Sequence, residues 1–173
     1  MRGALALLLA TAIPGIAAAQ TTITLRLPVK DVMFLTSTSS TLTLSPPTQA
    51  VYDGTLTVVT GPALTVESNR TWTVALTSVA TFSFANAAGN VFANPSKPAT
   101  EVSWAVTNSP FTASGTLGVT GANVTFTGAT GSAASYAPTA SATATLYFRP
   151  SWLYSRDVPG VYSLSTLLTL ATP

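Results

Sequence analysis

Apolar and polar residues alternate with a period of two along most of this 173-residue chain, and this pattern constrains the fold more than any other feature. Successive side chains of a β-strand point to opposite faces, so such alternation is typical of strands with one buried face. The clearest case is 70–77, where Trp72, Val74 and Leu76 fall on one side. No segment after residue 19 has the 3.6-residue period of an amphipathic helix. We therefore predict an all-β protein.

Short runs of this kind recur between Gly, Pro and Asn residues that indicate turns. The predicted strands cover 22–27, 41–44, 55–59, 63–67, 70–77, 81–84, 101–107, 115–120, 124–127, 142–149 and 161–170. Loops are expected over 86–100 and 128–139, and a turn at Gly61-Pro62. A spacing of about 8 to 12 residues predicts an antiparallel β-sandwich of about 8 to 10 strands, immunoglobulin-like or pilin-like, in a single domain over 20–173.

The segment Asp157-Val158-Pro159-Gly160 has the composition of a tight turn. Proline suits the position with φ near −65°, and glycine suits the position with positive φ. Tyr162 follows directly, at the start of the predicted closing strand. A tyrosine just past such a turn often packs its ring inward and bonds its hydroxyl to the backbone, as in the tyrosine corner of Greek-key sandwiches.

The first 19 residues have the three parts of a secretory signal peptide. They are Arg2, an apolar region over 4–16, and the small residues Ala17-Ala18-Ala19. We predict cleavage before Gln20 and export to the periplasm, the cell surface or the medium. The apolar run is shorter than the roughly 20 residues that a transmembrane helix needs, so no membrane span is expected after cleavage.

Charged residues make up only 7% of the chain, and the formal net charge is +2. Nucleic-acid binding needs clustered Lys and Arg side chains that displace counterions from phosphates. Here the basic residues are scattered, so a nucleic-acid partner is not expected. The chain has no cysteine, so we expect burial and backbone pairing, rather than disulfides, to stabilise the exported protein.

The chain also has no histidine, and this limits its chemistry. Without His and Cys, Cys-His and Ser-His-Asp catalysis and His-based metal sites are excluded. Asp31 and Asp157 each follow a basic residue, which indicates surface pairing or turn capping. Ser96-Lys97 lies between two prolines in a predicted loop, so we expect a solvated lysine rather than Ser-Lys catalysis. We predict no enzyme and no cofactor; a calcium site using Asp53 or Asp157 with backbone carbonyls stays an alternative.

Two groups of aromatic residues differ in their sequence surroundings. Trp72 and Trp104 fall on the apolar side of alternating strands, which predicts core packing. Trp152 and Tyr154 lie in a stretch without alternation. They either pack over the end of the sandwich or form an exposed pair that stacks on sugar rings or contacts a partner protein.

The segment 20–29 suggests assembly. Predicted cleavage frees this segment, and Ile23, Leu25 and Leu27 alternate with polar residues. It is either the first strand of its own domain or a strand that completes the sheet of a neighbour. In the second case the partner is another copy of this protein or another envelope protein, joined by strand addition.

Three segments resemble known secreted bacterial β-sandwich domains. They read VESNRTWTVALTS, SWAV and RDVPGVYSLSTLLTLATP, and the resemblance runs from Leu64 to the carboxyl end. They are similar to the WxL-type surface domain and to the spore-coat-U and pilin-like group, which implies a sandwich fold and a place at the cell surface. Trp72 is followed by Thr-Val and Trp104 by Ala-Val, in place of the W-x-L signature. Peptidoglycan attachment is therefore not implied.

Together these observations predict a non-catalytic, exported cell-envelope protein with a structural or adhesive role, such as a subunit of a surface fibre or coat. The alternative is a secreted carbohydrate-binding module that acts through Trp152 and Tyr154.

Overall fold

The structure is a computed structural model that describes residues 26–86 and 96–173. These residues are mostly β, in antiparallel sheets of which none is closed. Strands make up 47% and helices 5%. The described helical segments are α1 (Gln49–Tyr52) and the 3-10 turn η1 (Ala99–Glu101). The predicted β class is confirmed.

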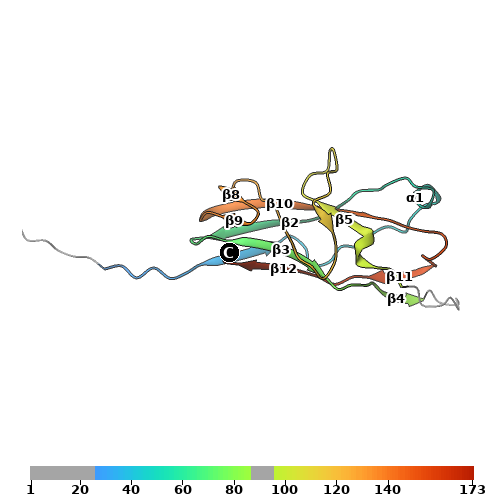
Figure 1. Cartoon of the computed structure of the whole chain (residues 1–173), viewed down its shortest axis with the longest axis horizontal. Coiled ribbons are helices and arrows are strands. Elements are labelled where there is room, and N and C mark those ends of the chain that lie inside the picture. Colours follow the sequence, from blue (N-terminus) through green and yellow to red (C-terminus); the bar gives the residue numbers. More distant parts are fainter. Residues whose placement is uncertain (1–25, 87–95) are drawn as a thin grey trace, which may run out of the picture.

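The larger sheet has five strands and contains the two longest ones (Figure 1). In spatial order its strands are β1 (Met33–Ser37), β2 (Val59–Ser68), β10 (Thr139–Pro150), β5 (Val102–Ala105) and β6 (Gly115–Thr116). The strands β2 and β10, of 10 and 12 residues, pair along most of their length. The strand β1 forms one edge of this sheet.

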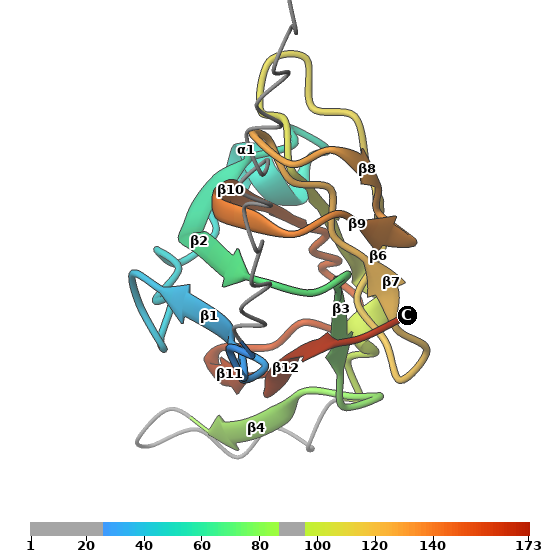
Figure 2. The same ribbon diagram turned by 90° about the vertical axis from the view of Figure 1, so that its left-hand side faces the viewer.

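A second sheet has three strands, with β3 at its centre. Its order is β12 (Thr166–Ala171), β3 (Thr73–Ser78) and β7 (Ala122–Asn123). Two small pairs complete the described residues: β11 (Gly160–Ser163) with β4 (Ser83–Asn86), and β8 (Gly131–Ser132) with β9 (Ser135–Tyr136). Figure 2 shows β2 and β10 across from β3 and β12 when the molecule is viewed from one end.

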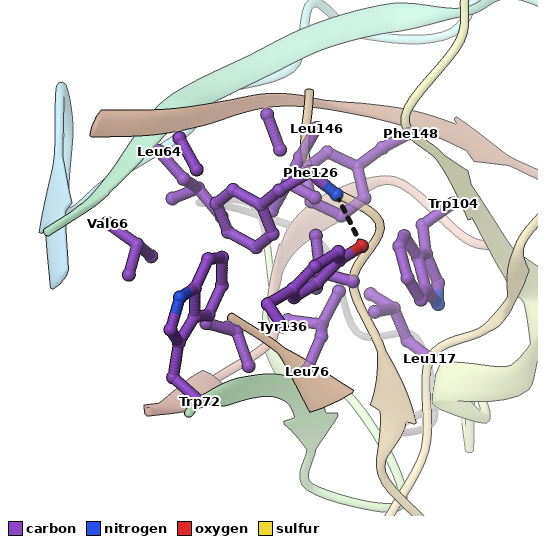
Figure 3. Packing of buried hydrophobic residues seen from close by; sticks show 14 of the residues in the cluster. Leu64, Val66, Trp72, Leu76, Trp104, Leu117, Phe126, Tyr136, Leu146 and Phe148 are labelled. Atoms are coloured by element: carbon purple, nitrogen blue, oxygen red, sulfur yellow. Dashed lines mark hydrogen bonds between the residues drawn. The ribbon is translucent and has the colours of Figure 1, made fainter. Parts of the chain in front are cut away.

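One hydrophobic core cluster takes side chains from both of these sheets (Figure 3). Leu64 and Val66 come from β2, and Val74 and Leu76 come from β3. The alternating residues of β10 also enter it, and their neighbours stay more exposed. The core follows directly from the period-two pattern, since every second residue of a strand points to the same face.

Aromatic rings occupy the centre of this core. Trp72 and Trp104 are fully buried, which confirms that both are core residues. Tyr136 is also buried, and its hydroxyl accepts a 2.9 Å hydrogen bond from the Phe126 N–H (Figure 3). The rings of Trp72 and Phe126 meet edge to face with centroids 5.2 Å apart.

Gly61-Pro62 was predicted to be a turn, and this prediction is wrong. The strand β2 runs through both residues. Thr145 of β10 pairs with Ala63, but Tyr147 pairs with Thr60, so β2 has one extra residue here. Such a bulge accepts a proline, which has no N–H to donate to the ladder. Residues 55–58, predicted as strand, are not in one.

The predicted strand over 41–44 is also absent. The Ser39 hydroxyl donates a hydrogen bond to the Thr41 carbonyl at 2.6 Å and accepts one from the Thr41 N–H at 3.2 Å. Short polar side chains that bond to nearby backbone in this way compete with sheet formation. Residues 41–44 do alternate, but bonds of this local kind replace pairing with another strand.

The predicted closing strand over 161–170 is two strands. Ser163 of β11 pairs with Ser83 of β4, whereas Thr166 of β12 pairs with Ser78 of β3. The chain changes partner because β3 and β4 are themselves separated by residues 79–82. At the start of β11, the Tyr162 hydroxyl donates a 3.0 Å hydrogen bond to the Val158 carbonyl, as predicted. The predicted tight turn over 157–160 is wrong, because the turn lies at 154–156 and Gly160 is a strand residue without a positive φ.

The described residues contain twelve strands, more than the predicted 8 to 10. Four of them, β6 to β9, have only two residues each. They lie between residues 115 and 136, where two longer strands and a loop were predicted. Gly, Thr and Ala make up most of this segment, and its frequent turn residues give no periodic signal for short pairings.

Candidate functional site

Four charged side chains meet beside the connection between β10 and β11, at the end of the molecule where α1 lies (Figure 1). This charge cluster consists of Lys97, Glu101, Arg156 and Asp157. Lys97 lies two residues before η1, and Glu101 ends it. Arg156 and Asp157 lie in the turn that leads into β11. The cluster therefore joins two segments that are far apart in the sequence.

Lys97 lies at the centre of the charge cluster, and its side chain is fully buried. Its ammonium donates hydrogen bonds to Asp157 Oδ2 at 2.9 Å, Glu101 Oε2 at 3.0 Å and the Ser151 carbonyl at 2.6 Å. These use all three N–H groups of a lysine. Nζ also lies 4.4 Å from the centroid of the Trp152 ring, a cation–π contact. The prediction of a solvated Lys97 is therefore wrong.

Surface pairing or turn capping was expected for Asp157, and its side chain is buried. It accepts a 2.8 Å hydrogen bond from the Leu153 N–H and two 3.2 Å hydrogen bonds from Arg156. Arg156 also pairs with both carboxylate oxygens of Glu101. Surface pairing is thus wrong for Asp157, whereas its hydrogen bond from the Leu153 N–H agrees with the turn-capping alternative. Surface pairing agrees with the structure for Asp31, whose exposed carboxylate pairs with Arg70.

Burial disfavours the charged form of Asp157, whereas hydrogen bonds stabilise that form. Burial would raise the pKa of this carboxyl, but hydrogen bonds from Arg156, Lys97 and the Leu153 N–H hold the pKa below its ordinary value of 3.8. Hydrogen bonds to Asp157 and Glu101 raise the pKa of Arg156. The two cations and two carboxylates balance, as a buried network requires.

The same contacts bear on the calcium alternative. Asp157 contacts two cations, so its carboxylate is already neutralised. Across residues 26–86 and 96–173, no group of three or more metal-ligating side chains comes together. The geometry offers no calcium site at Asp157.

Sequence reasoning missed the charge cluster, although one signal was present. Lys97 and Glu101 are four residues apart, a spacing that brings side chains together on a helical turn. Asp157 lies 60 residues from Lys97, and nothing local to either residue indicates that they meet.

Trp152 borders the charge cluster and is half-buried. Its ring contacts Lys97 on one side and meets the Tyr162 ring edge to face, with centroids 5.6 Å apart. It also borders a pocket of about 280 Å³. The other residues around this pocket carry hydroxyl or apolar groups, among them Thr43, Ser45, Thr57, Val59 and Pro150.

Tyr154 has different neighbours from Trp152. It is 61% exposed and stacks on Tyr52, with ring centroids 4.5 Å apart and planes 20° apart. The structure therefore places the two residues in separate aromatic contacts, Trp152 with Tyr162 and Tyr154 with Tyr52. A ligand-stacking role for Trp152 and Tyr154 stays a prediction.

The proposed partner strand is described only in part. Ile23 and Leu25 lie outside the described residues. Leu27 is 76% exposed and is not in a strand. From Arg26 the chain runs outside the sheets before it enters β1 at Met33 (Figure 1).

No family model matches this chain, and neither a curated protein nor a solved structure matches it. Among the helices of the described residues, none has the length and apolar character to cross a membrane.

Proposed function

We propose that this chain is a non-catalytic, exported cell-envelope protein that builds a surface fibre or coat from copies of itself. Each copy would donate its amino-terminal segment to the sheet of the next. The observation that carries this proposal is the exposure of the segment before β1. Leu27 and Val29 are 76% and 77% exposed, so their apolar side chains are not used by their own core.

The described sheets offer unpaired edges that suit such a donated strand. Within each main sheet, β1 and β12 are the outermost strands on one side, and they do not pair with each other. They lie on the same side of the molecule (Figure 2). Leu35 of β1 and Leu168 of β12 are only partly buried, although both pack against the core. An edge strand has free N–H and C=O groups that can pair with an added strand.

We further propose that the two main sheets form an immunoglobulin-like or pilin-like sandwich. The shared core cluster between β2, β10 and β3 supports this arrangement. The hydrogen bond from Tyr162 to Val158 also supports it, because it reproduces a feature of Greek-key sandwiches.

Size-exclusion chromatography and electron microscopy of the protein test the assembly. We expect oligomers or filaments for the unaltered protein, and monomers after deletion of 20–29 or after the paired changes Leu27→Asp and Val29→Asp. Val119→Asp is the matched control, since Val119 is also an exposed apolar residue, at 70%. A protein that stays monomeric in every form would overturn the proposal.

A carbohydrate-binding module is the second candidate, and the pocket beside Trp152 favours it. An aromatic ring with surrounding hydroxyl groups suits a sugar, and the volume is close to the lower end for small-ligand sites, about 300 Å³. On a glycan array we expect binding that Trp152→Ala and Thr57→Val weaken. Tyr154→Ala removes the exposed tyrosine pair without changing the pocket, so it shows which of the two places binds the sugar. An empty array, or binding that neither pocket variant changes, excludes this candidate.

A further inference from the structure

We propose that Lys97 and Asp157 condense within the folded chain to form an amide cross-link between their side chains. This inference is independent of the proposed assembly, because it rests only on the charge cluster. Lys97 supplies the amine, Asp157 supplies the carboxyl group, and Glu101 moves the proton.

The two reacting groups are held together in a buried position. Nζ of Lys97 lies 2.9 Å from Oδ2 of Asp157, and both side chains have no exposed surface. Their hydrogen bonds to the Ser151 carbonyl and the Leu153 N–H fix the orientation of each group. Holding two reactants in this way replaces a collision between molecules with a local step, equivalent to effective concentrations of about 10⁵–10⁸ M in favourable cases.

Lys97 and Asp157 can become neutral together without leaving another charge of the cluster unpaired. When the Lys97 ammonium gives a proton to the Asp157 carboxylate, it leaves a free amine beside a carboxylic acid. Arg156 and Glu101 remain an ion pair, so no charge is left without a partner. The pKa of Asp157 lies below its ordinary value, so the carboxylate is the resting form of Asp157 and the carboxylic acid is a minor form. An irreversible condensation draws on that minor form.

The chemical step is a condensation that releases one water molecule. The Lys97 nitrogen attacks Cγ of Asp157 and forms the C–N bond. Glu101, whose Oε2 lies 3.0 Å from Nζ, takes a proton from this nitrogen and supplies it to the leaving hydroxyl. One C–O bond breaks, and water departs. An ammonium and a carboxylate thus become a neutral amide and water, with no change in oxidation state.

Neighbouring donors assist the carbonyl group of Asp157. The Leu153 N–H and the Arg156 guanidinium both donate hydrogen bonds to this carboxylate. Donors at these positions stabilise the negative charge that develops on oxygen during the attack. The same Arg156 Nη2 contacts Glu101 and Asp157, so the proton carrier and the leaving oxygen are neighbours.

The product suits the site better than the reactants do. Burial penalises charged groups, and the reaction removes one ammonium and one carboxylate from the buried cluster. The amide would join the segment before β5 to the turn between β10 and β11. It would close a covalent loop through the larger sheet.

Tryptic peptide mapping by mass spectrometry tests the link on the purified full chain after denaturation. Trypsin does not cut efficiently before proline, so Lys97-Pro98 and Arg149-Pro150 stay intact. Unlinked protein gives separate peptides over 71–156 and 157–173. Linked protein gives one branched peptide with their summed mass less one water, and fragmentation places the bond on Lys97 and Asp157.

Variants separate the bond from other modifications. Lys97→Met and Asp157→Ala should abolish the branched peptide, and Glu101→Gln should slow its appearance at least tenfold after refolding. Asp31→Ala breaks the exposed pair with Arg70 and should leave the yield unchanged. If the unaltered, folded protein gives only the two separate peptides after prolonged incubation, the proposal is overturned. This result needs no variant to fold.

Discussion

Nζ of Lys97 and Oδ2 of Asp157 lie 2.9 Å apart, and neither side chain is exposed to solvent. A fully buried ion pair contributes little net stability by itself, because the desolvation of both charges offsets their attraction. Each of the two charges nevertheless needs the other to compensate it in the protein interior. Removing either one leaves a charge in the protein interior without compensation.

The first prediction follows from this dependence. Lys97→Met removes the cation and leaves the cluster with a surplus carboxylate. We expect the free energy of unfolding to lie about 3–5 kcal/mol below that of Lys97→Arg, a reference that keeps the cation but cannot form the amide; this is the usual cost of breaking a buried pair. Urea unfolding followed by tryptophan fluorescence measures this.

Arg70→Ala is the matched control for that measurement. It breaks the pair with Asp31, whose side chains are largely exposed. Exposed pairs contribute about 0–1 kcal/mol. Equal losses in the two variants would contradict a special dependence on the buried cluster.

The second prediction concerns acid and uses Lys97→Arg, which keeps a cation but lacks the amine needed for the amide. The pKa of Asp157 is depressed in the folded state. Its contribution to stability is therefore complete above the ordinary carboxyl value of 3.8 and is lost as the pH falls below it through the folded pKa. We expect the urea midpoint of this variant to fall as the pH drops below the ordinary value of 3.8.

Adding Asp157→Asn to Lys97→Arg removes the titrating group. The double variant should have a flatter midpoint over the same acid range, after allowance for the other carboxylates. If both proteins lose stability in parallel, Asp157 is not the group responsible.

The third prediction concerns the bulge in β2. A Cβ atom added at Gly61 would lie 2.5 Å from Cε2 of Phe148 and 3.0 Å from the Leu146 carbonyl oxygen. Gly61→Ala must therefore displace a core ring, and we expect a loss of about 1–3 kcal/mol in the free energy of unfolding. Gly118→Ala is the control, because its nearest neighbour, Thr100 Cγ2, is 3.9 Å away. Thermal unfolding by circular dichroism should separate the two variants.

Gly61 also shows which features of the fold the sequence could and could not predict. Alternation is a local property, so it correctly placed Trp72, Val74 and Leu76 in the core. The role of Gly61 depends on Phe148, which is far away in the sequence. A Gly-Pro pair indicates a turn on local grounds, whereas here it accommodates a ring from the neighbouring strand.

The charge cluster could not be predicted for the same physical reason. Lys97 lies in a segment rich in proline and asparagine, which is typical of a solvated loop. Its burial depends on the turn that carries Asp157. The sequence correctly predicted the hydroxyl bond of Tyr162, although the turn lies at 154–156 rather than at 157–160. The Tyr162 hydrogen bond could be predicted from nearby residues, whereas the contact between Asp157 and Lys97 could not.

The last prediction concerns Tyr136, whose hydroxyl accepts a hydrogen bond from the Phe126 N–H within the core. Tyr136→Phe keeps the ring and its contact with Trp72, where the centroids lie 4.6 Å apart. It leaves the Phe126 N–H buried without this acceptor. An unsatisfied buried donor costs about 1–3 kcal/mol, so we expect a loss of that size in the free energy of unfolding.

Tyr162→Phe is the matched comparison for Tyr136→Phe. It also removes one hydroxyl, but the partner is the Val158 carbonyl in a half-buried turn that water can reach. We expect a smaller loss, about 0.5–1.5 kcal/mol. Urea unfolding of both variants under the same conditions measures the difference. A larger loss for Tyr162→Phe would mean that the turn, rather than the aromatic core, contributes more to stability.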